Sequence, residues 1–192
     1  RSVSRGLGDV YKRQMALFER YGNDPAVFAW ELWNEQNTVN AGRENVKKWQ
    51  EEMFERISGV CKKQLVVNSC GSFDGKGARA DYGYFYKGTA NQIAAIHRYL
   101  DEGAEYEICK GPLDVAAADA VGEIAKICRD RPALLAETGA VQPKHSGPWR
   151  FYGADKDGII FHDAFYAPFF AGAAGSGQPW HWDVYIYGRG LW

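Results

Sequence analysis

The chain has 192 residues, of which 46% are hydrophobic and 15% aromatic, and its formal net charge is −1. This composition excludes a disordered chain, a coiled coil, a collagen and a basic nucleic-acid-binding domain, so we expect no nucleic-acid partner. No apolar run approaches the roughly 18 residues that a membrane-spanning helix needs, so we also expect no membrane span. The class that remains is a folded globular domain.

The first 14 residues differ in charge from the rest. Residues 1–14 have a net charge of +3 and residues 15–192 a net charge of −4. Their segment SRGLGDVYKRQ resembles, residue for residue, the translation of a DNA-sequencing adapter, and it shows no helix or strand periodicity. We interpret residues 1–14 as a non-native adapter-like segment, with a natural basic arm as the alternative. On the first interpretation the natural gene extends upstream of Met15, and the lack of a signal peptide says nothing about export.

From Met15 onward, short apolar runs alternate with amphipathic stretches. Strands are predicted at 26–33, 64–69, 92–99, 131–139 and 178–187, and helices at 41–60, 113–129 and 162–177. Loops are predicted at 71–90 and 141–155, where Gly, Asp and other polar residues gather. Within these strands, apolar and polar residues do not alternate cleanly, and a helix separates most strands from the next. This pattern is typical of a parallel sheet covered by helices, which is an α/β fold.

The spacing of the strands narrows this class. One marker residue at the carboxyl end of each predicted strand gives the series Glu35, Asn68, His97, Glu137 and Trp180. The intervals are 33, 29, 40 and 43 residues, compared with roughly 31 residues per unit in a (β/α)8 barrel before loop insertions lengthen it. Neither GxGxxG nor GxxxxGK(S/T) occurs, which disfavours a doubly wound nucleotide-binding sheet. We therefore expect a TIM barrel.

Two glutamates end separate predicted strands, at the end of the barrel where such enzymes place their active sites. Glu35 follows Asn34 in the sequence WNEQN, and Glu137 lies 102 residues later in LLAETG. Two carboxylates in a cleft rich in Trp and Tyr are the groups that glycosidic cleavage needs, because one protonates the leaving oxygen and the other attacks the anomeric carbon. The pair therefore indicates a glycosidase.

Four segments resemble those of one enzyme family. FAWELWNEQ, IHRY, LLAETG and QPWHWD are similar, in this order, to the strand 4, 6, 7 and 8 signatures of the retaining (β/α)8 glycosidases of glycoside hydrolase clan A, of the cellulase and mannanase type (family 5-like). The resemblance covers residues 15–192 and implies a partial TIM barrel, with strands 4 to 8 present and strands 1 to 3 and the last helix missing. Such an open sheet has unpaired edges, so we expect the chain to fold poorly alone.

The resemblance implies a role for each residue of the two glutamate motifs. Glu35 would be the general acid/base and Glu137 the nucleophile of a retaining double displacement, which needs carboxyl groups about 5 to 5.5 Å apart. Asn34 would bind the 2-hydroxyl of the sugar. The implied reaction is hydrolysis of β-O-glycosidic bonds in a carbohydrate substrate of the β-glucan or β-mannan type.

Four further residues are candidates for substrate binding. His97 and Tyr99 share one face of their strand by period-2 alternation, and they would line the cleft, with Tyr99 near Glu137. Trp180 and Trp182 share a face of the last predicted strand, and one of them would stack on a sugar ring. These two strands would thus place His, Tyr and Trp side chains around the pair of carboxylates.

Several features have two interpretations. Asn68 either reaches the cleft or caps a loop, and His145 is similarly ambiguous. The aromatic residues at 82–86 either line distal sugar subsites or cover the top of the barrel. The protein as a whole could also be a non-catalytic carbohydrate-binding barrel, although the intact pair of Glu35 and Glu137 favours an enzyme.

The spacing of the cysteines and histidines gives little support to a metal site. The four cysteines form no CxxC pair and the four histidines no HExxH motif, so we expect neither a metal nor a cofactor. The residues leave the compartment and the oligomeric state open. The resemblance alone implies export, as a secreted or periplasmic protein.

Overall fold

The structure is a computed structural model that describes residues 3–188, with side chains placed for residues 12–184, 186 and 187. The helices are α1 (Val3–Tyr21), α2 (Arg43–Ser58), α3 (Ala78–Tyr86), α4 (Leu113–Ile127), α5 (Ile159–Phe170) and α6 (Trp182–Gly188). The strands are β1 (Ala29–Glu31), β2 (Leu65–Val67), β3 (Ala94–His97) and β4 (Ala133–Glu137). Short 3-10 helices lie in the loops at Gln36–Thr38, Glu107–Lys110, Pro143–His145 and Tyr152–Ala154.

The described strands form two parallel pairs. β1 pairs with β2, and β3 pairs with β4 in a register that places His97 opposite Glu137 after an irregularity at Ile96 and His97. Each strand is followed by a helix before the next strand begins, because parallel neighbours need a crossover connection. The carboxyl ends of the strands in each pair therefore lie at the same edge.

Side-chain amides join the two pairs where the regular ladder stops. The backbone N–H of Gln92 donates to the carbonyl of Val66 at 3.0 Å, and the Gln92 side-chain oxygen accepts from the N–H of Val66 at 2.8 Å. Asn91 Oδ1 accepts from the N–H of Asn68 at 2.7 Å. These contacts satisfy buried backbone groups that no neighbouring strand reaches, so β2 and β3 lie next to each other.

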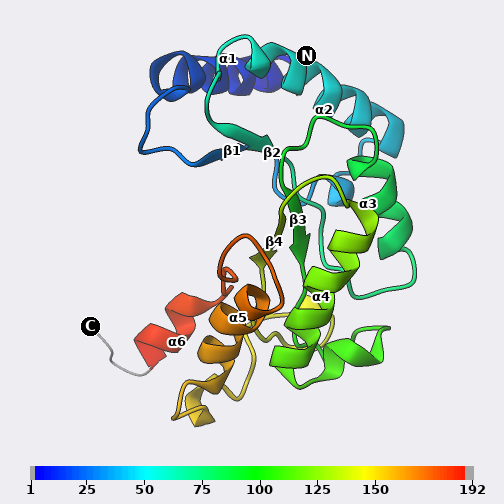
Figure 1. Cartoon of the computed structure of the whole chain (residues 1–192), viewed down its shortest axis with the longest axis vertical. Coiled ribbons are helices and arrows are strands. Elements are labelled where there is room, and N and C mark those ends of the chain that lie inside the picture. Colours follow the sequence, from blue (N-terminus) through cyan, green and yellow to red (C-terminus); the bar gives the residue numbers. More distant parts are fainter. Residues whose placement is uncertain (1–2, 189–192) are drawn as a thin grey trace.

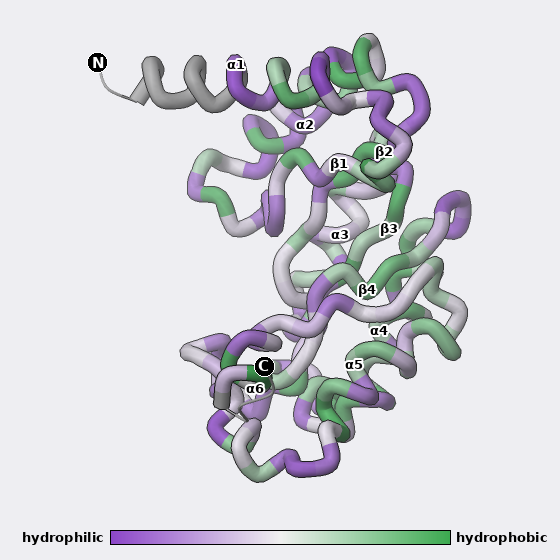
Figure 2. The backbone as a smooth tube through the Cα atoms, turned by 90° about the vertical axis from the view of Figure 1, so that its left-hand side faces the viewer, coloured by the Kyte–Doolittle hydropathy of each residue, from purple (hydrophilic) through white to green (hydrophobic). Residues whose placement is uncertain are grey.

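The elements form a crescent, with β1 to β4 along its inner side and α2, α3 and α4 along its outer side (Figure 1). Hydrophobic residues concentrate in the strands and in α4 and α5, whereas α2 is largely hydrophilic (Figure 2). One buried cluster joins α3 and α4 to β3 and β4, and a second packs α2 and the end of α1 against β1 and β2. The helices therefore bury the outer face of the strands.

Most of the predicted elements are confirmed, together with the α/β fold class. The helices predicted at 41–60 and 113–129 correspond to α2 and α4, and the strands predicted at 26–33, 64–69, 92–99 and 131–139 to β1, β2, β3 and β4. The helix predicted at 162–177 matches α5 only in its first half, because α5 ends at Phe170 and residues 171–177 are not helical. The observed strands are shorter than the apolar runs that predicted them. Regular pairing covers only three to five residues of each run.

The loop predicted at 71–90 is wrong for its second half, because α3 occupies Ala78–Tyr86. Its glycines and Asp81 favoured a loop. However, Tyr82, Phe85 and Tyr86 recur at the spacing of one helical face, and all three are buried. Burial of this aromatic face outweighs the weak helix propensity of the segment.

The last strand, predicted at 178–187, is also wrong. This segment meets the end of β4 through an isolated bridge between Thr138 and Pro179, and Trp180 N–H donates to the Thr138 carbonyl at 2.7 Å. His181 then has a left-handed backbone with φ of 57°, which ends the extended run, and α6 starts at Trp182. Trp180 and Trp182 therefore do not share a strand face.

The absence of helical periodicity in residues 1–14 does not match the structure either. α1 begins at Val3 and continues through Met15 to Tyr21 without a break. The side chains of residues 1–11 are outside the described part of the chain, and Phe18 packs against Trp30 at 4.9 Å between ring centroids. Among the described residues, none of the helices has the length and apolar character that crossing a membrane requires.

Candidate active site

Glu35 lies just beyond β1 in an unusual backbone conformation. Its φ and ψ of 52° and 48° are left-handed, a conformation that costs a non-glycine residue free energy unless neighbouring contacts hold it. Its N–H donates to Ser69 Oγ at 2.9 Å, and that hydroxyl donates to Asn34 Oδ1 at 2.9 Å. The end of β2 therefore fixes both residues of the Asn-Glu motif.

Asn68 reinforces this junction and does not line the cleft. Its Oδ1 accepts from the N–H of Trp33 at 2.9 Å, and its Nδ2 donates to Gln36 Oε1 at 3.1 Å. The side chain is fully buried. Of its two interpretations, the structure supports that of an amide that caps a loop, here the loop that presents Glu35.

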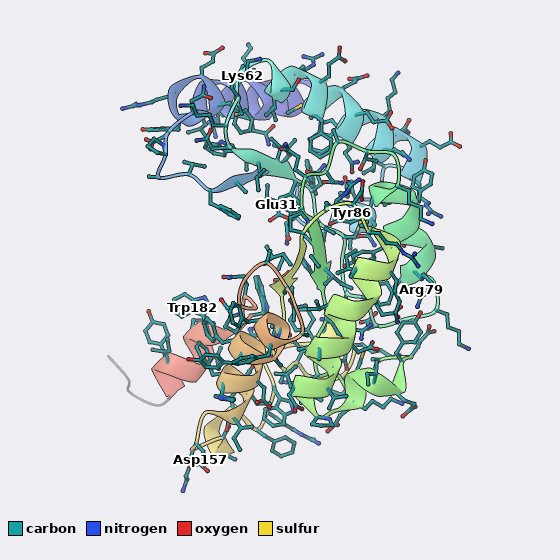
Figure 3. All side chains as sticks on the ribbon, in the orientation of Figure 1. Glu31, Lys62, Arg79, Tyr86, Asp157 and Trp182 are labelled. Carbon is teal, nitrogen blue, oxygen red and sulfur yellow. The ribbon has the colours of Figure 1, made fainter. Side chains whose placement is uncertain are left out.

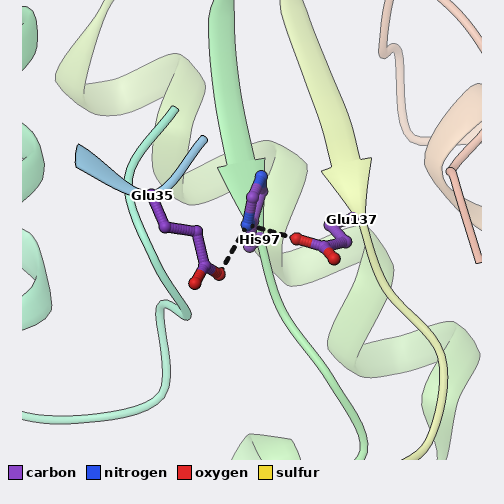
Figure 4. A group of neighbouring side chains, drawn as sticks. All are labelled: Glu35, His97 and Glu137. Atoms are coloured by element: carbon purple, nitrogen blue, oxygen red, sulfur yellow. Dashed lines mark hydrogen bonds and ion pairs between the residues drawn. The ribbon is translucent and has the colours of Figure 1, made fainter. Parts of the chain in front are cut away.

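His97 lies between Glu35 and Glu137 (Figure 4). Its Nδ1 is 2.9 Å from Glu35 Oε1 and also 2.9 Å from Glu137 Oε2. One oxygen of each carboxylate and one imidazole nitrogen lie within 4.8 Å of one another. The two carboxylates thus approach from opposite sides of one buried imidazole, at the carboxyl ends of three strands.

The electrostatics of this group follow from the shared imidazole. Burial alone would lower the pKa of His97, but hydrogen bonds to Glu137 and Glu35 outweigh it and raise the pKa to about 9. The hydrogen bond from His97 in turn lowers the pKa of Glu35, against the opposite effect of burial. At neutral pH His97 is therefore a protonated imidazolium, and Glu35 beside it is ionised.

Tyr99 lies beside Glu137, as its place on the strand predicted. Burial raises its pKa above the usual range, and the charge and hydrogen bond of Glu137 raise it further. The phenol therefore stays protonated and can donate to the carboxylate. The Tyr99 ring also meets the His145 ring edge to face, with 4.9 Å between ring centroids.

The glutamates open into a cleft of about 450 Å³. Its lining includes the predicted residues Asn34, Glu35, Tyr99, Glu137 and Trp180, together with Asn37, Thr38, Gly71, Ser72, Asp74, Val141, His145 and His181. Trp180 is 50% exposed. A polar floor with one aromatic wall is suited to a sugar, whose ring has both hydroxyls and an apolar face.

Two predicted site residues, His97 and Trp182, are not part of this lining. His97, which we expected to line the cleft, is instead buried between the two glutamates. Trp182 starts α6 and is 52% exposed (Figure 3). A helix turns successive side chains by about 100°, so Trp182 does not repeat the orientation of Trp180. Asp74 was not predicted as a cleft residue, and the sequence left the roles of His145 and His181 ambiguous. Only their positions in loops after predicted strands could have indicated them.

Comparisons with known proteins agree with an α/β fold of the mannanase kind. No protein-family model matches the chain. The chain is 29% identical to mannan endo-1,4-beta-mannosidase A of Podospora anserina, over 68% of this chain and 36% of that protein. It therefore spans about a third of the length of this curated relative.

The structure is similar to that of a hyperthermostable endo-1,4-beta-D-mannanase from Thermotoga petrophila, solved with maltose and glycerol. The TM-score is 0.56 at 16% sequence identity, over 92% of this chain and 54% of that one. At this identity the likeness concerns the fold alone. The chain covers about half of the solved mannanase.

Proposed function

We propose that the chain is the catalytic part of a retaining β-glycosidase that hydrolyses β-O-glycosidic bonds, with Glu35 as general acid/base and Glu137 as nucleophile. The main support is the separation of the carboxylates, whose facing oxygens lie within 4.8 Å. Retaining enzymes hold the two groups about 5 to 5.5 Å apart, whereas inverting enzymes need about 6.5 to 9.5 Å to admit a water molecule. The spacing supports a covalent glycosyl-enzyme intermediate.

In the first step Glu137 would attack the anomeric carbon while Glu35 protonates the leaving oxygen. Glu35 is ionised in the free cleft, so it must first gain a proton. The nearest one is on His97 Nδ1, 2.9 Å from Glu35 Oε1, and transfer along this hydrogen bond would give the acid form. After Glu137 becomes an ester, its negative charge is lost and the pKa of Glu35 falls further, so Glu35 can then accept a proton from water.

A β-1,4-linked mannan is the first substrate to test, and a β-glucan the second. Both similar proteins are named for cleavage of mannan. Trp180 would stack on a sugar ring, and Asn34 would bind its 2-hydroxyl. We further propose that residues 15–188 correspond to part of a (β/α)8 barrel, since the parallel pairs with outer helices superpose on about half of the solved mannanase.

Glu137→Gln tests the assignment of the nucleophile. We expect the wild-type chain to hydrolyse aryl β-mannosides and mannan with retention at the anomeric carbon, measured by NMR of the first product. Glu137→Gln should abolish this activity. Glu107→Gln, at an exposed carboxylate of the Glu107–Lys110 helix, is the matched control and should leave the rate unchanged.

Glu35→Ala tests the acid/base role. It should reduce hydrolysis of substrates with poor leaving groups by about 10² to 10⁴-fold, and azide should partly restore the rate on activated aryl glycosides as the β-glycosyl azide forms. Full activity in Glu137→Gln would disprove the nucleophile. Binding of mannan by a wild-type chain that never hydrolyses it would instead indicate a non-catalytic carbohydrate-binding barrel.

A further inference from the structure

A second cluster of ionisable side chains lies beside the catalytic pair. Asp74, Asp101 and His145 come from the loops that follow β2, β3 and β4. His145 Nε2 is 3.0 Å from Asp74 Oδ2 and 3.6 Å from Asp101 Oδ2, and the three atoms lie within 4.8 Å of one another. Three loops distant in sequence thus direct one ligand atom each to a common point.

Asp101 is the member of this cluster whose burial requires explanation. Its side chain is 1% exposed. Oδ1 accepts the N–H groups of Gly103 at 2.7 Å and Lys144 at 3.0 Å, but the buried Oδ2 has no hydrogen-bond partner among the described residues. A buried carboxylate oxygen without a partner is costly. This oxygen is directed at His145 from a distance beyond hydrogen-bond range.

The turn that carries His145 is held in a strained backbone conformation. Lys144 and His145 are consecutive non-glycine residues with left-handed φ angles of 59° and 56°. Gly103 approaches this turn so closely that a Cβ atom would lie 2.7 Å from the nitrogen of Lys144. Two strained residues and a close backbone approach together fix the direction of the His145 ring, which also packs on Tyr99.

The distances suit ligands of one metal ion. Zn–N and Zn–O bonds are about 2.0 to 2.2 Å long, so two ligand atoms at a tetrahedral angle lie about 3.4 Å apart. The observed separations of 3.0 and 3.6 Å from His145 Nε2 lie on either side of that value. An imidazole with two carboxylates favours a transition metal over calcium or magnesium, which prefer oxygen ligands throughout.

We propose that Asp74, Asp101 and His145 bind a divalent transition-metal ion of the zinc type. Asp74 and His145 line the cleft whereas Asp101 is buried behind them, so the remaining coordination position would face the cleft. There it would take a water molecule or a sugar hydroxyl. Ligation requires a neutral imidazole, so the ion would displace a proton from His145 and bind more weakly as the pH falls.

Calorimetric titration of the whole chain with Zn²⁺ tests this site without relying on hydrolysis. We expect one ion per chain, and at least a tenfold loss of affinity in Asp101→Asn, whose remaining oxygen can still accept from Gly103 and Lys144. Asp74→Asn should lose affinity for Zn²⁺ as well. Because the Asp74 side chain is less buried, this variant tests the site even if Asp101→Asn fails to fold. Co²⁺ should give visible absorption bands that both variants lack.

Two controls locate the ion. Asp163→Asn alters a separate histidine–aspartate pair, that of His162 and Asp163 on α5, and should bind Zn²⁺ like the wild type. Glu137→Gln should also bind normally, which separates this proposal from the proposed hydrolysis. The inference is overturned if the wild type binds no stoichiometric ion, if Asp101→Asn and Asp74→Asn bind as tightly as the wild type, or if Glu137→Gln abolishes binding.

Discussion

His97 connects two carboxylates through a single nitrogen atom, and this contact governs the charge of the site. The imidazole is 1% exposed and its Nδ1 lies 2.9 Å from both Glu35 and Glu137. Each carboxylate would be less stable in the cleft without it, because two negative charges within 5 Å repel each other in a partly buried environment. His97 therefore positions both carboxylates and also carries the proton that Glu35 would receive.

The raised pKa of His97 predicts a loss of stability at alkaline pH. The pKa is about 9 in the fold and about 6.5 in an unfolded chain. The stabilisation is therefore complete below pH 6.5 and disappears as the pH rises through 9. Urea unfolding between pH 6 and 10 should show this fall in the wild type and a smaller one in His97→Gln. Parallel curves for the two proteins would contradict the prediction.

Glu35 predicts a loss of stability at acidic pH. Its pKa in the fold is lowered, so the contribution of this group is present above the ordinary carboxylate pKa and is lost as the pH falls through the folded value. The His97–Glu35 contact needs both a protonated His97 and an ionised Glu35. It is therefore lost at alkaline pH, where His97 loses its proton, and at acidic pH, where Glu35 gains one.

Trp180 and Trp182 offer a matched test of the sugar platform. Trp180 lines the cleft and Trp182 begins α6, although the two side chains are about equally exposed at 50% and 52%. Trp180→Ala should raise KM for mannan by about tenfold, corresponding to about 1.4 kcal/mol of lost binding. Trp182→Ala should change KM by less than about twofold. A larger effect at Trp182 would contradict the assignment of Trp180 as the sugar platform.

Most of the residues at the centre of the site follow from the sequence, but their contacts do not. Asn34, Glu35 and Glu137 lie at strand ends whose positions the apolar runs predict. Asp74 and His145 lie in loops without any periodicity, so no local pattern predicts where their side chains point. Their proximity depends on how three loops pack against one another.

At the scale of elements, α3 is the helix that holds the strand ends in register. Tyr82 is fully buried, and its hydroxyl lies 2.8 Å from the carbonyl of Cys70 and 3.1 Å from the N–H of His97, which donates to it. Tyr86 makes a similar contact, with its hydroxyl 2.8 Å from the carbonyls of Asn68 and Ala95. The two tyrosines thus link β2 to β3 directly behind the cleft.

Tyr82→Phe tests this link. Loss of the hydroxyl leaves the buried N–H of His97 without its acceptor, so the free energy of unfolding should fall by about 1 to 3 kcal/mol. Tyr84→Phe on the same helix is the control. Its ring lies under Arg43 and Lys47 near the surface, so we expect a change below about 0.5 kcal/mol. Equal effects in urea unfolding would assign the stabilisation to the helix itself and not to the link.

On the scale of the whole molecule, β1 presents an edge that no described strand covers. β1 pairs with β2 on one side only, and Phe28 just before it is 72% exposed. Unpaired strand edges with apolar side chains associate with other chains. The inner side of the crescent, where Glu31 lies, is therefore the side from which association should begin (Figure 3).

Phe28→Lys should reduce this association. We expect the wild type to form concentration-dependent oligomers in light scattering after size exclusion, and the variant to shift toward monomer. Phe170→Lys is the control for general hydrophobic exposure, since Phe170 is 81% exposed and lies in helix α5, not in a strand. A wild type that stays monomeric at every concentration tested would contradict this prediction.

The α/β class, the order of most elements and the two glutamates could be predicted from the residues alone, because hydrophobic period and residue chemistry act over short stretches. The fold was needed to show that α3 and α6 are helices, that Trp180 lines the cleft without Trp182, and that one imidazole joins both carboxylates. It also brought Asp74, Asp101 and His145 together. The physical reason is that these features depend on burial and on contacts between residues 40 to 71 positions apart in the sequence, which no local pattern encodes.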